Sequence, residues 1–297
     1  MIGASGLVGA HLLRAFRELG EVVGTYHSHW QEGLEPLDIT DRQRVAALIQ
    51  RLHPGVVLCP AAIPSVEECE LQPEATRRVN VEGMGNVIEA VGASGGRLVY
   101  FSSDYVFDGT RGPYSEDDAT RPINEYGRQK LECERLVEEK LRDFLVVRTS
   151  TVYGWEEQGK NFVMRLIREL GAGREVRVPC DQMGTPTYAP NLALAVRELV
   201  SKGHRGVYHV VGPESVDRYR FALMVSEVFG LDSRLLVPVD TRTLGQAAPR
   251  PLDCAMRCDK ARAALQTPLL PARQGLEAMR AAAPTGSLLT TKGAPDA

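Results

Sequence analysis

The stretch that decides the fold is residues 3–9, which read Gly-Ala-Ser-Gly-Leu-Val-Gly and open a run of helix formers that ends near Leu19. Three glycines at this spacing allow a backbone to approach a pyrophosphate closely. The helix behind them offers free N–H groups and the positive end of its dipole to the same anion. The stretch therefore predicts a turn that holds the phosphates of a dinucleotide cofactor through Gly3, Gly6, Leu7 and Val8.

The segments after this turn alternate between strands and helices. We expect an apolar strand at 21–26, a short apolar segment at 37–39, a helix at 41–52 and another strand at 55–59. With the first turn they give the βαβαβ order of a dinucleotide-binding fold. The sequence therefore predicts an α/β protein with a doubly wound Rossmann sheet of parallel strands.

The first strand of such a sheet is represented only by Met1 and Ile2. A central strand normally contributes about five residues, and without it the neighbouring strands would keep unpaired backbone groups in a buried place. We therefore expect a truncated first strand in a chain that, as given, begins late.

A second informative stretch contains Tyr126 and Lys130, four residues apart among helix formers, so both side chains share one helical face. An ammonium near a phenol lowers the phenol pKa from about 10. Such a phenol can pass a proton to or from a substrate oxygen, and Ser103, at the end of an apolar strand, could hydrogen-bond the same oxygen. Because this spacing also arises by chance on solvated helices, the interpretation depends on the surrounding motifs.

Those motifs are specific. Residues 102–109 read SSDYVFDG, 113–118 read PYSEDD and 121–134 read RPINEYGRQKLECE. Together they resemble the catalytic block of the extended short-chain dehydrogenases/reductases, in the group of sugar-nucleotide reductases named after dTDP-4-dehydrorhamnose reductase. The loop 181–187, DQMGTPT, and the Arg-Pro pair at 250–251 match later motifs of the same group, so the resemblance covers nearly the whole folded chain.

The resemblance implies a reductase that carries hydride from NAD(P)H to a 4-keto nucleotide sugar, with dTDP-4-dehydrorhamnose, reduced to dTDP-L-rhamnose, as the first candidate. Tyr126 would protonate the carbonyl oxygen, Lys130 would lower the Tyr126 pKa and hold the nicotinamide ribose, and Ser103 would orient the carbonyl. Further cofactor contacts implied by the resemblance are Asp38, Ile39, Ala62, Ile63 and Pro64. Substrate contacts implied in the same way are Ser103, Asp104, Thr151, Gln182 and Arg250.

Two positions depart from the pattern of the group. Thr151 stands where the rhamnose enzyme usually has a Trp against the sugar, and loss of an aromatic platform changes the pocket by a large apolar area. His11 stands where some members have a Glu that helps to hold a metal ion at a dimer contact. The reaction class is therefore better determined than the particular sugar, and a homodimer is left open.

The stretch 25–29, Thr-Tyr-His-Ser-His, is where such folds often place a ribose-binding acid. It contains neither a carboxylate nor an arginine. NADP is therefore allowed and slightly favoured, while NAD also stays open.

Two other functions fit the same motifs. One is an epimerase or ketoreductase that acts on another nucleotide sugar. The other is a binding protein without turnover, because the group includes an NADP-binding regulatory subunit of methionine adenosyltransferase that also retains Tyr-x-x-x-Lys. The motif alone does not separate these functions.

The composition excludes several classes. A net charge of −3 over 297 residues gives no basic field for nucleic acid, and no apolar run approaches a membrane span or a signal peptide. We expect a cytoplasmic enzyme without nucleic-acid or membrane partners. The six cysteines and six histidines show no ligand spacing, so we expect reduced thiols and no metal site.

After the last sheet strand the regular alternation breaks, as expected if a small substrate-binding lobe is assembled from insertions. We assign 1–153, with returning segments such as 188–211, to the NAD(P)-binding Rossmann domain. Residues 154–187 and 212–283 form the predicted lobe at the C-terminal side. The small, polar residues 284–297 are expected to be a disordered tail.

Overall fold

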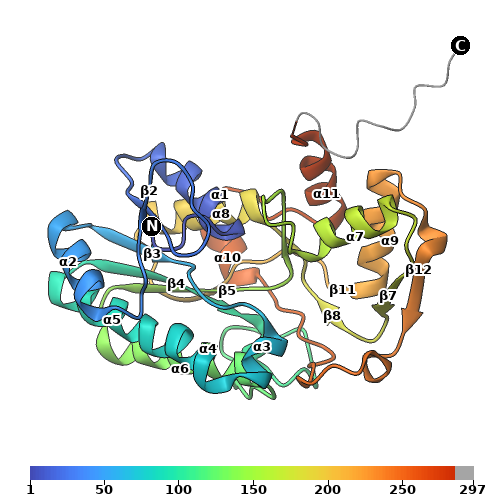
Figure 1. Cartoon of the computed structure of the whole chain (residues 1–297), viewed down its shortest axis with the longest axis horizontal. Helices are drawn as coiled ribbons and strands as arrows, with labels where there is room; N and C mark the ends of the chain where they lie inside the picture. Colours follow the sequence, from blue (N-terminus) through green and yellow to red (C-terminus); the bar gives the residue numbers. More distant parts are fainter. Residues whose placement is uncertain (285–297) are drawn as a thin grey trace, which may run out of the picture.

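The computed structural model describes residues 1–284, so almost all of the predicted disordered tail lies outside the described residues. Four parallel strands form the centre of the fold in the order β10-β5-β4-β3 (Figure 1). Their bounds are Val56–Cys59 for β3, Arg97–Ser103 for β4, Phe144–Thr149 for β5 and Gly206–His209 for β10. A second parallel pair, β1 and β2, covers Gly24–Tyr26 and Leu34–Pro36.

The first four residues lie between β1 and β3. Ile2 N–H donates to the Leu58 carbonyl at 2.8 Å, Thr25 N–H donates to the Met1 carbonyl at 2.9 Å, and Ala4 N–H donates to the Thr25 carbonyl at 2.7 Å. The short amino-terminal segment thus takes the central position of the sheet, and these hydrogen bonds connect β1 and β2 to the four other strands. The resulting order confirms the predicted doubly wound parallel sheet.

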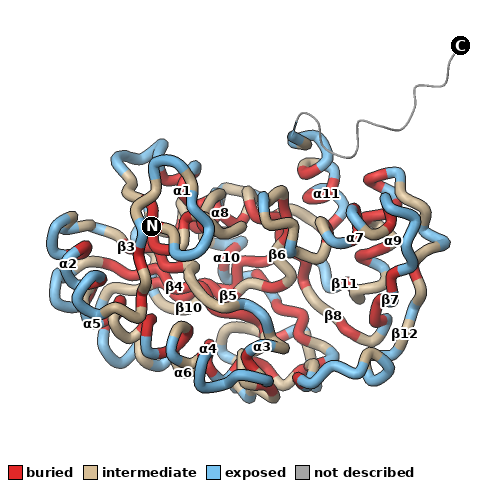
Figure 2. Tube along the Cα trace, viewed as in Figure 1, coloured by how far each residue is buried: buried red, intermediate tan, exposed pale blue. Residues whose placement is uncertain are grey.

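Helices cover both faces of this sheet (Figure 1). On one face α1, α8 and α10 pack against the strands, and on the other α2, α5 and α6 do so. Their bounds are Leu7–Arg17, Ala189–Ser201, Asp259–Ala264, Arg42–Leu52, Met84–Ser94 and Glu125–Lys140 in that order. Figure 2 shows the buried strands between the two helical layers, as expected for parallel strands that are covered on both faces.

Local sequence sets the ends of several helices. The side chains of Asp41, Asn124 and Asp217 each accept a hydrogen bond from a backbone N–H in the first turn of the helix that follows, α2, α6 and α9 respectively. Gly95 and Gly230 end α5 and α9 with positive φ angles of 69° and 66°, a conformation that glycine adopts without cost.

The helical region from Pro73 to Ser94 is interrupted. It consists of α4 (Pro73–Arg77), a π-helical segment (Arg78–Gly83) and α5, and it follows the short helix α3 (Val66–Leu71). The π segment contains Asn80, a buried residue whose side chain is engaged in tertiary hydrogen bonds. A local widening of this kind is often found near functional sites.

A third hydrophobic cluster lies beside the sheet and joins α7, α9 and α11 with two short strand pairs. The helices cover Phe162–Gly171, Arg218–Phe229 and Ala272–Ala281. The strand pairs in and near this lobe are β7 (Val176–Pro179) with β12 (Leu236–Val239), β8 (Met183–Gly184) with β11 (Val216–Asp217), and β6 (Val152–Tyr153) with β9 (Thr187–Tyr188). Short 3-10 turns cover Asp104–Val106, Ser233–Leu235 and Thr241–Leu244.

The predicted domain boundaries are only partly reflected in the packing. Cys254, Met256 and Ala261 fall in the range assigned to the lobe, yet they pack in the same cluster as the sheet residues, because α10 lies against β10. The boundaries themselves stay a prediction. None of the helices within residues 1–284 has the length and apolar character needed to span a bilayer.

Candidate active site

The amino terminus of α1 has the features of a phosphate site. No side chain caps it, and Gly6 occupies the cap position in an extended conformation. The backbone N–H groups of the first turn, including Leu7 and Val8, therefore keep their hydrogen-bonding capacity for a ligand. These are the groups that the glycine spacing singled out.

Two glycines make this turn sterically possible. Gly3 has φ of 86°, and a Cβ atom there would lie 2.9 Å from the Cα of Ala61. At Gly9 a Cβ atom would lie only 2.0 Å from the Gly3 carbonyl oxygen, so α1 packs directly on the turn. This close approach of helix and turn is typical of turns that hold a diphosphate.

The adenosine side of the predicted cofactor site contains an acid that the stretch 25–29 does not. The Asp38 carboxylate lies 3.8 Å from His27 Nε2, and hydrogen bonds from Thr40 hold its pKa below the usual value. Asp38 and Ile39 follow β2, and pairing of β2 with β1 brings them to the end of β1. Asp38, a predicted cofactor contact, therefore places a carboxylate beside the stretch 25–29, which contains none of its own.

The loop after β3, with Ala62, Ile63 and Pro64, is held by Asn80. The Asn80 side chain accepts from Ile63 N–H at 2.7 Å and donates to the Ile63 carbonyl at 3.1 Å. It also donates to the Gln129 side chain on α6 at 2.8 Å. Asn80 therefore links the predicted cofactor loop to the helix that carries Tyr126 and Lys130.

Ser103, Tyr126 and Lys130 are brought together as predicted. Ser103 is the last residue of β4. Helix α6 packs closely on the segment that follows, where a Cβ atom at Gly127 would lie 2.1 Å from the Tyr105 carbonyl oxygen. Lys130 is buried, its Nζ donates to the Phe101 carbonyl at 2.9 Å and lies 5.7 Å from the centre of the Tyr126 ring.

The acidity of Tyr126 differs from the sequence-based expectation. Burial raises the Tyr126 pKa above its ordinary value, the Asp104 carboxylate adds to the increase, and a hydrogen bond with Ser103 opposes it. Burial in turn lowers the Lys130 pKa. The prediction that Lys130 lowers the Tyr126 pKa is therefore wrong for the net shift, because desolvation of the phenolate outweighs the attraction of the ammonium.

Asp104 connects Ser103 to the substrate side. Its carboxylate accepts hydrogen bonds from Ser103 Oγ at 2.8 Å and from Ser150 Oγ at 2.6 Å, and burial raises its pKa. Because the Asp104 carboxylate accepts hydrogen bonds from both serines, it fixes the rotamer of the Ser103 hydroxyl beside Tyr126.

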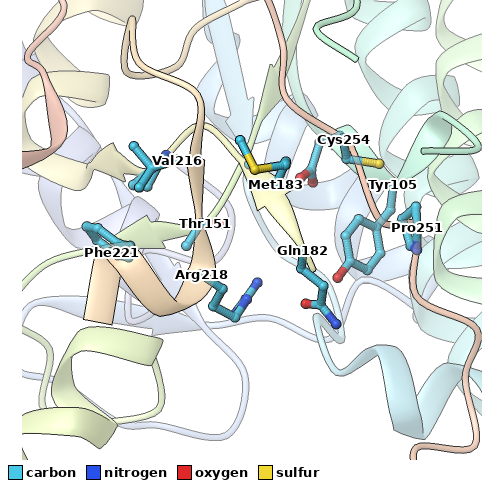
Figure 3. Close-up of a pocket in the computed structure, with 12 residues that line it drawn as sticks. Tyr105, Thr151, Gln182, Met183, Val216, Arg218, Phe221, Pro251 and Cys254 are labelled. Carbon is cyan, nitrogen blue, oxygen red and sulfur yellow. The ribbon is translucent and has the colours of Figure 1, made fainter. Parts of the chain in front are cut away.

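A pocket begins at Asp104 and extends between the sheet and the lobe (Figure 3). Thr151 and Gln182, both predicted substrate contacts, also line it. Thr151 has φ of 42°, the left-handed region that a β-branched residue rarely adopts, which is a strain often found at functional positions. Three of the five predicted substrate residues therefore share one cavity.

The other two predicted substrate residues are not among those that line this pocket. Ser103 adjoins it through Asp104, whereas Arg250 donates to Glu67 Oε1 at 2.7 Å and is engaged there. The assignment of Arg250 to the substrate stays a prediction.

Sequence reasoning missed most of the lining. Its further members are Tyr105, Met183, Gly184, Pro186, Val216, Arg218, Phe221, Pro251 and Cys254. Five of them, namely Tyr105, Met183, Gly184, Pro186 and Pro251, lie inside the motifs quoted above but were not assigned to the substrate. Val216, Arg218 and Phe221 belong to β11 and α9, where no motif pointed to a site. Only the cap at Asp217, which fixes the start of α9, marked their place in the sequence.

The residues considered for metal binding form no such site within 1–284. His11 Nε2 is buried, without a hydrogen-bond partner in that range, and burial lowers the His11 pKa to about 4. All six cysteines are free thiols, and only Cys180 is exposed.

A family model described as RmlD substrate binding domain matches residues 1–284. The chain belongs to the RmlD substrate binding domain family. This membership confirms the resemblance to the extended short-chain dehydrogenases/reductases, and the family includes NAD(P)-dependent sugar-nucleotide reductases.

Relatives of this RmlD-family chain carry mixed names. The probable low-salt glycan biosynthesis reductase of Haloferax volcanii is 36% identical over 257 residues, which cover 84% of this chain and 86% of that protein. The dTDP-4-keto-6-deoxy-D-glucose reductase of Streptomyces niveus is 35% identical over 269 residues, covering 90% and 91%. Methionine adenosyltransferase 2 subunit beta of Xenopus laevis is 32% identical over 266 residues, covering 87% and 79%.

Solved structures agree with the fold. The dTDP-4-dehydrorhamnose reductase of Bacillus anthracis, in complex with NADP, matches with a TM-score of 0.83 and 30% identity over 95% of this chain and 98% of that one. A hypothetical dTDP-4-dehydrorhamnose reductase of Sulfolobus tokodaii has the same TM-score and 33% identity over 91% and 95%. The RmlD-family chain thus shares its architecture with reductases along nearly its whole length.

Proposed function

We propose that this protein is an NAD(P)H-dependent reductase of a 4-keto nucleotide sugar, with dTDP-4-dehydrorhamnose as the first substrate to test. The observation that carries the proposal is that Ser103 and Tyr126 contact Asp104 and Tyr105, two residues that line the pocket between the sheet and the lobe. The reductases among the relatives support the same reaction class.

The residues present fit a nicotinamide dinucleotide. The start of α1 has no side-chain cap, and α1 packs on the glycine turn at a distance that excludes a Cβ atom, as in turns that hold a diphosphate. Gly3, Gly6, Leu7 and Val8 would hold the phosphates, Asp38 and Ile39 the adenosine, and Ala62, Ile63 and Pro64 the nicotinamide half. When bound, the reduced nicotinamide supplies the hydride.

The chain itself supplies the proton and the orientation. With a raised pKa, Tyr126 stays protonated at neutral pH and can donate its proton to the carbonyl oxygen of the sugar. Ser103 would position that oxygen by turning toward it the hydroxyl proton that it donates to Asp104 in this structure. The buried ammonium of Lys130 would contact the ribose of the cofactor and stabilise the phenolate that remains.

A second function is favoured by a specific observation, the 32% identity to methionine adenosyltransferase 2 subunit beta. In this case the protein would bind a cofactor and regulate a partner enzyme without turnover. An epimerase or ketoreductase that acts on another nucleotide sugar would use the same three residues.

The test is NADPH and NADH oxidation with a panel of nucleotide-linked keto sugars, dTDP-4-dehydrorhamnose included, and with product analysis. We expect turnover that is lost in Tyr126→Phe. Cofactor binding without turnover on any member of the panel would contradict the reductase and favour the regulatory function.

A further inference from the structure

Two arginines of the lobe lie on one aromatic ring without an acidic partner. Arg165 belongs to α7 and Arg218 is the first residue of α9, and their guanidinium carbons lie 5.6 and 5.0 Å from the centre of the Phe162 ring. Neither guanidinium forms an ion pair or a hydrogen bond with another residue in the part of the chain that the structure describes. Two positive charges are therefore held close to each other without a direct ion pair, although the Glu169 and Asp104 carboxylates act on them from a greater distance.

Neighbouring arginines on the same helices show that this is not a general lack of acids in the lobe. Arg168 on α7 pairs with Glu169 at 2.9 Å, and Arg220 on α9 pairs with Asp217 at 3.2 Å. Burial and the charge of Arg218 together lower the Arg165 pKa. A pair of like charges with reduced solvation is stabilised when an anion binds between or beside them.

The position of Arg218 indicates which anion. Arg218 lines the same pocket as Asp104, Thr151 and Gln182, and Figure 3 shows its side chain directed toward the Gln182 amide. Asp104 adjoins Ser103, so Arg218 lies on the lobe side of the reaction centre, and Arg165 lies next to it at Phe162. A nucleotide sugar has the same order, with the reacting sugar first and the diphosphate attached to it.

We propose that Arg165 and Arg218 form an anion subsite that binds the diphosphate of the nucleotide-sugar substrate. The planar guanidinium matches two phosphate oxygens at once, which a lysine at either position would not do. Phe162 fixes both side chains by cation–π contact, so less rotamer freedom is lost when the diphosphate binds. The inference rests on the proposed function, because that function defines the substrate.

The experiment measures binding rather than turnover. Dissociation constants for dTDP and UDP are determined by calorimetry on the full chain in the presence of NADPH, with thymidine and inorganic pyrophosphate as partial ligands. We expect Arg218→Gln and Arg165→Gln each to weaken the tighter nucleoside diphosphate at least about fivefold, the range of a charged hydrogen bond at a half-exposed site. Thymidine binding should change little, and pyrophosphate should follow the diphosphates.

Arg168→Gln and Arg220→Gln are the matched controls, since they remove one positive charge from the same two helices. The dissociation constants of these two variants for the nucleoside diphosphates should stay within about twofold of those of the unchanged protein. An equal loss of diphosphate affinity in all four variants would mean that only the general positive field of the lobe acts, and it would overturn the subsite. Unchanged affinity in all four variants would overturn it as well. If neither diphosphate binds the unchanged protein, the subsite is also overturned, and keto-sugar turnover then decides separately whether the proposed function stands.

Discussion

Glu134 and Arg148 form a buried, two-point ion pair between α6 and β5, with Nε to Oε1 at 2.9 Å and Nη2 to Oε2 at 2.7 Å. Their side chains are 3% and 6% exposed. Glu134 lies four residues after Lys130 on the same helix. The pair therefore fixes the helix that carries Tyr126 and Lys130 against the sheet that carries Ser103.

Glu134→Gln should lower the free energy of unfolding by about 3–5 kcal/mol, because it leaves the Arg148 charge buried without its partner. Denaturant unfolding measures this loss. Glu138→Gln, an exposed position one turn further along α6, should change the free energy by less than about 0.5 kcal/mol. A loss of the same small size at Glu134 would mean that the pair does not hold the helix.

Tyr126→Phe should leave NADPH affinity and melting temperature nearly unchanged and lower turnover by about 10² to 10⁴, the usual effect of a positioned acid. Because burial raises its pKa, Tyr126 should also stay protonated up to pH 10 in the protein alone. Absorbance titration of the protein and of Tyr126→Phe tests the second statement. A phenol that ionises below pH 9 and is missing in the variant would contradict it.

Gly9→Ala should destabilise the protein by about 1–3 kcal/mol and weaken NADPH binding, because the new methyl group would lie 2.0 Å from the Gly3 carbonyl oxygen. Gly85→Ala is the control, since nothing lies within 4 Å of a Cβ atom there and α5 should gain up to about 1 kcal/mol from the better helix former. Chemical denaturation and NADPH titration measure both effects. Equal behaviour of the two variants would disprove the close approach of α1 to the turn.

Asp38→Asn should shift cofactor preference toward NADPH by about threefold to tenfold, because its carboxylate lies near the end of β1 and repels a 2′-phosphate. Its lowered pKa keeps Asp38 ionised at neutral pH, so the effect should persist from pH 6 to 9. Dissociation constants for NADH and NADPH provide the ratio. Glu35→Gln, on β2 just before Asp38, should leave the ratio unchanged, and an unchanged ratio in Asp38→Asn would place the 2′-phosphate elsewhere.

His209 should make the fold sensitive to mild acid. Burial, followed by the nearby Arg148 charge, lowers its pKa to about 3, whereas in the unfolded chain it is near 6.5. The unfolded state therefore binds a proton that the folded state does not, and stability should fall by up to about 1.4 kcal/mol per pH unit below pH 6.5. Unfolding at pH 7 and pH 5 should show a smaller pH difference for His209→Asn, and an identical difference would exclude this cause.

Much of the fold could be predicted from local patterns. The glycine turn before α1, the strands β3 and β4 and the helix with Tyr126 and Lys130 all follow from residue spacing, because helical and strand periodicity are properties of short segments. The interruption of the helix at Asn80 could not be predicted, since it depends on hydrogen bonds to Ile63 and Gln129, which are distant in sequence.

The sequence by itself determined the fold class, and it singled out the glycine turn proposed to bind phosphate and the three residues proposed for catalysis, because these motifs lie in short segments of the chain. Only the tertiary structure decided the electrostatics and the pocket. The Tyr126 pKa depends on how deeply the packed helices bury the phenol, and the carboxylate near His27 comes from the adjacent strand. Arg218, at the start of α9, lines the same pocket as Asp104, although the two residues are far apart in the sequence. Desolvation and long-range packing of this kind leave no pattern in a local sequence.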